Sequence, residues 1–124
     1  MPEEFDASKP IYMQLAERIN KRIIRNELKS GEKLPSVREM AVQSGVNPNT
    51  VQRTYSELER MGIVETRRGQ GTFVTENKEV IKRIRERLKE EMMSEFVRNM
   101  KELGFTLDEI IAFLKDRRQK GEGI

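Results

Sequence analysis

The chain of 124 residues contains no cysteine and no histidine. Without thiols it has neither disulfides nor thiolate zinc sites, and without imidazoles it has no Ser-His or Cys-His pair and no histidine general base. No stretch approaches the roughly 18 apolar residues of a membrane span, and residues 1–9 are polar with no apolar signal core. These absences exclude most common catalytic sites, so we expect no enzyme, metal or cofactor, and a cytoplasmic location.

The length and charge of the chain limit its number of domains and its kinds of partner. A chain of this size suffices for one compact domain with an appendage, but not for two domains with separate cores. Charged residues make up 36% of the sequence, the net charge is +3 and the mean hydropathy is −0.74. A mildly basic chain is compatible with nucleic-acid binding, although the same charge also fits an ordinary solvated surface.

Three helices are predicted in the first half of the chain. Residues 10–28 place apolar side chains four apart, as an amphipathic helix does. Ser36 and Glu39 have the spacing of a capping box, which starts a short helix that Gly45 ends. Asn47 and Pro48 are a cap and a first-turn residue for a third helix, so a tight turn joins the last two helices.

A β-hairpin follows the third helix. Residues 63–66 and 72–75 have the composition of two short strands, and the basic, glycine-containing segment 67–71 lies between them as a turn. Three helices followed by a hairpin predict a mainly α fold, a winged helix-turn-helix domain over residues 1–76.

In this architecture the third helix enters the major groove of DNA and the hairpin, or wing, contacts phosphates or the minor groove. Asn and Gln pair with adenine and Arg with guanine, while Thr suits a phosphate or a thymine methyl. The candidate DNA-binding residues are Arg38, Asn49, Thr50, Gln52, Arg53, Arg67, Arg68, Gly69 and Gln70. The alternatives are a solvated helix face, a surface ion pair of Arg38 with Glu39 or Glu32, and a plain hairpin turn.

Four segments of this stretch resemble the GntR family of regulators: LPSVRE at 34–39, NTV at 49–51, ELE at 57–59 with Gly62, and RRGQGTFV at 67–74. The resemblance covers about residues 10–74. It implies operator contacts by Arg38, by Asn49, Thr50 and Arg53, and by Arg68, Gly69 and Gln70. Many relatives have arginine where this chain has Gln52, so the resemblance implies no base preference there.

Residues 77–124 are predicted to form a helical dimerisation tail of two helices. The first spans about residues 77–103, and the second starts at a capping box of Thr106 and Glu109 and runs to about residue 118. A two-helix tail resembles the YtrA subfamily, which implies a dimer. The apolar stripe expected to form the dimer interface is Ile81, Ile84, Leu88, Met92, Phe96, Met100 and Leu103. The alternative is that this stripe folds back on the first helix of the same chain.

The predicted function is a transcription regulator, expected to be a repressor, that binds a palindromic operator in double-stranded DNA as a homodimer. The alternative is a winged-helix module that docks onto another protein. Its binding would depend weakly on salt, whereas binding to DNA weakens steeply as salt rises. Carboxylate pairs for an enzyme, Asp108 with Glu109 or Glu90 with Glu91, are explained by capping or solvation. No residue pattern demands a small-molecule effector, and the sequence leaves its existence open.

Overall fold

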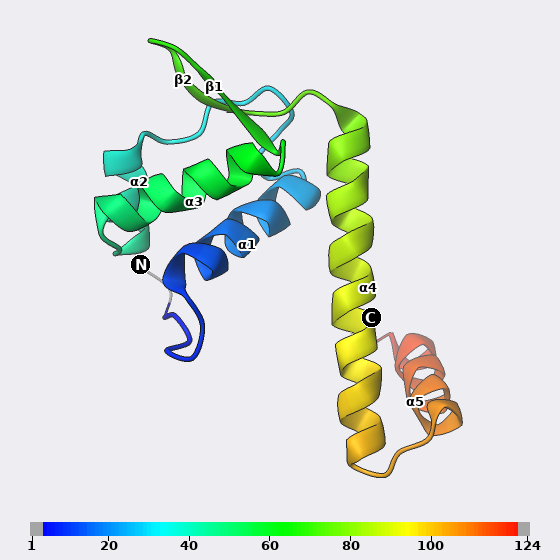
Figure 1. Ribbon diagram of the computed structural model, residues 1–124. Helices are drawn as coiled ribbons and strands as arrows, with labels where there is room; N and C mark the ends of the chain where they lie inside the picture. Colours follow the sequence, from blue (N-terminus) through cyan, green and yellow to red (C-terminus); the bar gives the residue numbers. More distant parts are fainter. Residues whose placement is uncertain (1–3, 122–124) are drawn as a thin grey trace. The chain divides into compact units, whose positions relative to one another are not determined.

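The computed structural model describes residues 4–121 and has the mainly helical fold with one antiparallel hairpin that the sequence predicts (Figure 1). Its elements are α1 Ile11–Ile24, α2 Val37–Ser44, α3 Pro48–Arg60, β1 Val64–Arg67, β2 Gly71–Val74, α4 Lys78–Glu102 and α5 Leu107–Lys120. The chain divides into two compact units, Met1–Arg85 and Glu86–Ile124, so the division falls within α4. The boundary expected from the sequence, between residues 76 and 77, lies just before this helix.

The first helix ends earlier than the predicted 10–28, at Ile24. Asn26 adopts a left-handed backbone with φ of 63°. The N–H of Asn26 donates to the carbonyl of Ile23 at 3.0 Å, and that of Glu27 donates to the carbonyl of Arg22 at 2.8 Å. These two bonds are the Schellman arrangement that closes a helix, and asparagine tolerates the conformation it requires.

The predicted start and stop of α2 and the predicted start of α3 are confirmed. The Ser36 hydroxyl accepts from the Glu39 N–H at 3.1 Å, while the Glu39 carboxylate accepts from the Ser36 N–H at 2.8 Å. Gly45 ends α2 in the left-handed region with φ of 68°. The Asn47 side chain accepts from the N–H of Asn49 at 2.7 Å, and Pro48 occupies the first turn of α3. The turn between the two helices is therefore fixed by local bonds.

The core of the first unit lies where α1, α2 and the hairpin meet α3. Its buried apolar side chains are Leu15, Ala16, Ile19, Ile23, Leu28, Leu34, Met40, Ala41, Val51, Tyr55, Leu58, Ile63, Val64 and Val74. One face of α3 packs against α1, α2 and the hairpin. The opposite face of α3 therefore stays at the surface.

Each strand of the hairpin lies one residue nearer the turn than predicted. β1 covers residues 64–67 instead of 63–66, and β2 covers residues 71–74 instead of 72–75. Val64 pairs with Val74, Glu65 with Phe73 and Arg67 with Gly71. The N–H of Gln70 donates to the carbonyl of Arg67 at 2.9 Å, which closes the turn between the strands. The turn therefore comprises residues 68–70 and presents fewer residues than the predicted 67–71.

The second unit contains the C-terminal part of α4 and all of α5. Gly104, with φ of 90°, follows α4, and the predicted capping box of Thr106 and Glu109 starts α5. α5 continues to Lys120, slightly beyond the predicted end. Among the residues that the structure describes, no helix combines the length and apolar character needed to cross a membrane.

Candidate nucleic-acid interface

The exposed face of α3 is bounded on one side by α1 and on the other by the hairpin. Thr54 Oγ1 donates to the carbonyl of Tyr12 at 3.2 Å on the α1 side, and the Glu59 carboxylate accepts from the N–H of Thr66 at 3.1 Å on the hairpin side. At 100° per residue, Asn49, Gln52 and Ser56 fall between these two edges. All three are exposed. The face predicted to contact bases is thus open from the start of α3 to its middle.

Arg53 leans toward the α1 edge of this face. Its guanidinium carbon lies 3.8 Å from the centroid of the Tyr12 ring, a cation–π stack. Stacking restricts the long side chain and directs it away from the hairpin. Gln52 and Arg53, which the sequence predicts on one reading face, are both exposed, and Arg53 is the one that stacks on Tyr12 of α1. Thr50 is half-buried, and its backbone carbonyl accepts from the Thr54 hydroxyl.

Arg38 lies in the first turn of α2 with an exposed side chain. Within residues 4–121 it has no ion pair, because the carboxylates of the acidic neighbours are engaged elsewhere. Glu39 caps α2, and its hydrogen bonds to the backbone and the hydroxyl of Ser36 lower its pKa. Glu32 accepts from the N–H of Lys29 at 3.0 Å. The surface ion pair considered for Arg38 is therefore absent from the described structure.

The loop before α2 is anchored to α3, which fixes where Arg38 stands. The Tyr55 hydroxyl donates to the carbonyl of Pro35 at 2.6 Å. Burial of this ring raises the pKa of Tyr55, so the hydroxyl stays protonated and keeps donating at any physiological pH. Arg38 and the exposed face of α3 are consequently held on one rigid scaffold.

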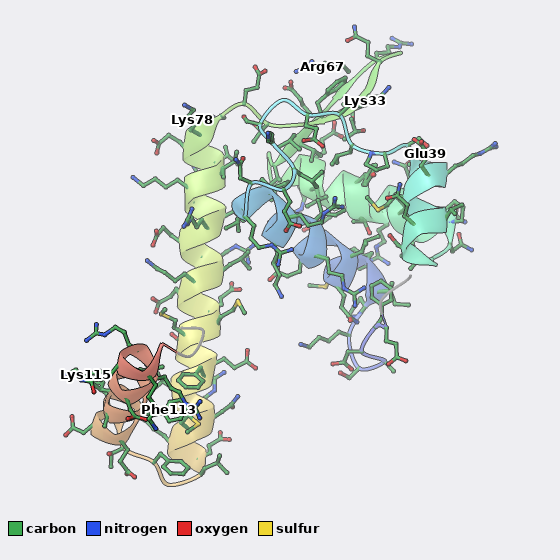
Figure 2. All side chains as sticks on the ribbon, turned by 180° about the vertical axis from the view of Figure 1, so that it is seen from behind. Lys33, Glu39, Arg67, Lys78, Phe113 and Lys115 are labelled. Atoms are coloured by element: carbon green, nitrogen blue, oxygen red, sulfur yellow. The ribbon has the colours of Figure 1, made fainter. Side chains whose placement is uncertain are left out.

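The two arginines of the wing have different surroundings, and the first of them, Arg67, is labelled in Figure 2. Arg67 forms an ion pair with Glu65 at 2.8 Å, and its guanidinium carbon lies 4.2 Å from the centroid of the Phe73 ring. Arg68 is exposed in the turn and has no ion pair among the described residues. Gly69, with φ of 76°, and Gln70 are exposed beside it. Of the two arginines, Arg68 is the one available to a ligand.

Sequence reasoning missed one cation, Lys33. It lies in the loop between α1 and α2, in a segment that contains no strand pattern of its own, yet it forms a β-bridge with Phe73 of the wing. Lys33 and Arg67 are both labelled in Figure 2. No local signal could have found it, because the pairing joins parts of the chain that are far apart in sequence.

Gly71→Ala is expected to destabilise the protein by about 1–3 kcal/mol, because the backbone conformation of Gly71 is one that L side chains rarely adopt. The φ of Gly71 is 123°, and an added Cβ would lie 2.7 Å from Cε of Lys33. Urea unfolding followed by circular dichroism measures the change. Gln70→Ala, at an exposed site beside it, is the control and is expected to change stability by less than about 0.5 kcal/mol. Equal unfolding midpoints for the two variants would contradict this account of Gly71.

The residues predicted for dimerisation differ in exposure. Ile84 and Leu88 are buried within the chain, and Ile81 and Met100 are half-buried. Met92, Phe96 and Leu103 are exposed. Other large apolar side chains of the second unit are also exposed, although the predicted dimer interface did not include them. They are Met93, Phe105, Leu107, Ile111, Phe113 and Leu114.

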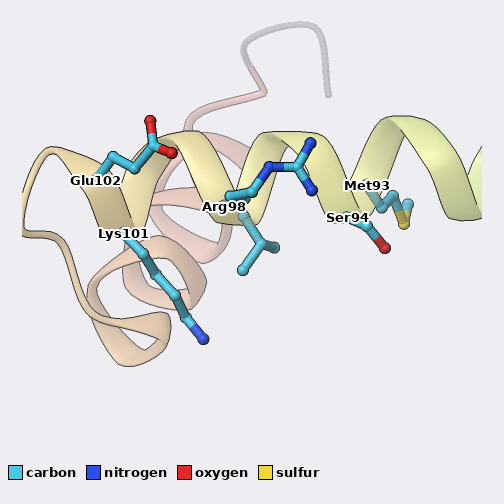
Figure 3. Close-up of a pocket in the computed structure, with 6 residues that line it drawn as sticks. Met93, Ser94, Arg98, Lys101 and Glu102 are labelled. Carbon is cyan, nitrogen blue, oxygen red and sulfur yellow. The ribbon is translucent and has the colours of Figure 1, made fainter.

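α4 contributes to two hollows described on this second unit. One, of about 390 Å³, lies between α4 and α5 and is apolar, with the rings of Phe96, Phe105 and Phe113 in its wall. The other is wide and open, and its six lining residues, Met93 and Arg98 among them, all come from α4 (Figure 3). The two hollows lie on different faces of α4, and the one beside α5 is the more apolar, because four of the six residues that line the other are polar or charged.

Three helices with an open recognition helix and a cationic wing define a winged helix-turn-helix DNA-binding protein. The family model described as "Bacterial regulatory proteins, gntR family" matches residues 11–74. The chain belongs to the GntR family of transcription regulators, and it is a regulator rather than an enzyme. The resemblance stated from the sequence motifs is thereby confirmed.

Among curated relatives, the chain is 54% identical over 121 residues to the uncharacterized HTH-type transcriptional regulator YhcF of Bacillus subtilis, covering 98% of this chain and 100% of that protein. It is 49% identical over 71 residues to the HTH-type transcriptional repressor YtrA of the same organism, covering 57% of this chain and 55% of YtrA. The similarity to YhcF therefore includes the tail, while that to YtrA covers about as much sequence as the DNA-binding unit.

Solved structures support the same fold. A GntR family transcriptional regulator from Listeria monocytogenes has a TM-score of 0.83 at 40% identity, over 90% of this chain and 98% of that one. The DNA-binding domain of AraR in complex with operator ORR3 has a TM-score of 0.53 at 29% identity, over 60% of this chain and 88% of that one. The second structure is of a related DNA-binding domain bound to an operator.

Proposed function

We propose that this protein is a homodimeric repressor that binds a palindromic operator in the cytoplasm. The observation that carries the DNA-binding part is the exposure of Arg38, Asn49, Gln52 and Arg68 on one domain, where neither arginine has an ion pair within residues 4–121. Cations and amides left unpaired on one rigid domain suit phosphate contacts and base contacts respectively. The repressor assignment follows the name of YtrA.

The dimer rests on the exposed apolar surface of the second unit. In this unit Leu88 and Ile110 are buried, whereas nine large apolar side chains are at least 40% exposed. A two-helix unit with so little buried surface gains too little to fold stably by itself. A stable interface buries roughly 800 Å² on each partner, and clustered aromatic and methionine side chains are typical of its centre. A second copy of the same unit is the occupant we propose.

Within each half-site, base selection falls to Asn49 and Gln52, which face outward between the two edges of α3. Arg53 stacks on Tyr12 at the α1 edge, so we assign it to the phosphate backbone that flanks the groove. Arg38 sits beside the N–H groups of the first turn of α2, where a phosphate is favoured by both the guanidinium and the helix dipole. Affinity then comes mainly from the arginines and specificity from the two amides.

The test combines light scattering of the purified chain with titration of a library of short palindromic duplexes at two salt concentrations. We expect the mass of two chains, selection of one palindrome and a steep loss of affinity as salt rises. A monomer that selects no duplex and is insensitive to salt would overturn the proposal and favour a protein-docking module.

Two variants separate affinity from selection. Arg68→Ala is expected to weaken binding to all duplexes and to lower the salt slope by about 0.9 for each bound chain, because one phosphate contact is lost. Gln52→Ala is expected to cost about 1–3 kcal/mol on the preferred palindrome and to leave the salt slope unchanged. Titrations of both variants on the selected and on a scrambled duplex measure the difference. Identical effects of the two substitutions would contradict this division.

A further inference from the structure

The loop before α2 extends the wing to a third strand-like segment. The N–H of Leu34 donates to the carbonyl of Thr72 at 2.8 Å, and the N–H of Val74 donates to the carbonyl of Glu32 at 2.8 Å. These two bonds flank Lys33 and Phe73, which therefore form a non-hydrogen-bonded antiparallel pair, the kind in which side chains lie closest. The position of Lys33 is thus set by backbone bonds on both sides of it.

The Lys33 side chain lies on the outer face of the wing. Paired residues project to the same side of a sheet, so Lys33 shares its face with Phe73 and Glu65, while the neighbouring Val74 is buried in the core. Gly71 is on this face too, two residues before Phe73. A Cβ on Gly71 would lie 2.7 Å from Cε and 3.5 Å from Nζ of Lys33. The lysine stem therefore crosses the space that Gly71 leaves open and carries its ammonium toward the turn.

The charge of Lys33 has no partner in the part of the chain that the structure describes. Within residues 4–121 no carboxylate lies within ion-pair distance of its ammonium, and the residue is exposed. Glu65, the acidic residue on the same face, pairs with Arg67 instead. Glu39 is affected by Lys33 only weakly, since the hydrogen bonds from Ser36 are the main causes of its lowered pKa. An exposed ammonium with no ion pair among the described residues is suited to a point contact with phosphate.

We propose that Lys33 contacts a DNA phosphate and is, with Arg68, one of two open cations of the wing. This inference rests on the proposed function and adds a residue from outside the hairpin to the DNA-binding surface. The glycine at position 71, which its φ of 123° favours, leaves open the space that the lysine stem crosses. The wing would then contact DNA through its turn and through one outer face.

Lys33→Met tests the proposal, because methionine keeps an apolar stem over Gly71 and removes the charge. The expected result is a salt slope lower by about 0.9 for each bound chain and a matching loss of affinity of about five- to tenfold per chain near 0.1 M salt. The preferred palindrome is expected to stay the same. Lys33→Arg, which restores a cation, is expected to recover most of the salt slope.

Lys21→Met, which removes an exposed cation from α1, is the matched control for overall charge. All variants are compared at equal folded fraction, measured by circular dichroism. If Lys33→Met and Lys21→Met give the same slope and affinity while the unsubstituted protein binds DNA steeply, the inference about Lys33 is wrong and the proposed function stands. If the unsubstituted protein shows no salt-dependent binding, the proposed function itself fails.

Discussion

Phe96→Glu is expected to convert the proposed dimer to a monomer and to weaken operator binding by about 100-fold or more. Phe96 lines the apolar hollow between α4 and α5, and its ring is 45% exposed in the single chain. A carboxylate buried at a subunit interface without a partner is strongly unfavourable. Loss of the dimer removes the second recognition helix, whose binding is favoured by a high effective concentration. Light scattering and operator titration on the same samples measure both effects.

Asn99→Glu adds the same charge to an exposed polar position of α4 and is expected to leave the dimer intact. Leu103→Glu is a second interface variant whose side chain is 72% exposed, so it disturbs packing within one chain least. Because its wild-type side chain has few contacts to lose, a folded monomer from Leu103→Glu would be direct support. A dimer that persists in both Phe96→Glu and Leu103→Glu would show that this surface does not join two copies.

Leu58→Ala is expected to lower the free energy of unfolding of the DNA-binding unit by about 2–5 kcal/mol. Leu58 is 0% exposed on the buried face of α3, where α1 and the hairpin also pack. The loss is large beside the roughly 5–15 kcal/mol that stabilises a typical domain. Because α3 carries the recognition face, DNA binding is expected to disappear at the lower temperature at which the unit unfolds.

Urea unfolding followed by circular dichroism at 222 nm measures this change, and the same samples can be titrated with operator. Val42→Ala on α2 is the matched truncation, since its side chain is 81% exposed and has little packing to lose. We expect Val42→Ala to stay within about 0.5 kcal/mol of the unsubstituted protein. If both truncations shift unfolding equally, Leu58 does not have the central packing position that its burial indicates.

Local signals in the sequence were sufficient for most of the fold. The capping boxes of Ser36 with Glu39 and of Thr106 with Glu109 form as predicted, and so do the stop at Gly45 and the cap at Asn47. Each depends on hydrogen bonds between residues within a few positions of one another, so residue type and spacing suffice. The same reasoning could have found the end of α1, because Asn26 is one of the few residues besides glycine that adopt its conformation.

The candidate site was predicted less completely. The sequence identified Arg38, Asn49 and Gln52 by type and spacing, but it could not show that Arg67 would be occupied by Glu65 and Phe73 while Arg68 stayed open. Periodicity likewise placed Ile84, Leu88 and Phe96 on one apolar stripe. It could not show that the first two are buried within the chain and the third is not.

By itself, then, the sequence determined the order of helices and hairpin, their local ends and the family, because these depend on short-range patterns of hydrogen bonding and hydrophobicity. Only the tertiary structure decided that Arg53 stacks on Tyr12 and that Lys33 joins the wing beside Phe73. The physical reason is that these pairs are far apart in the chain and meet only when α1, α3 and the hairpin pack around one core. No propensity of either partner specifies the other.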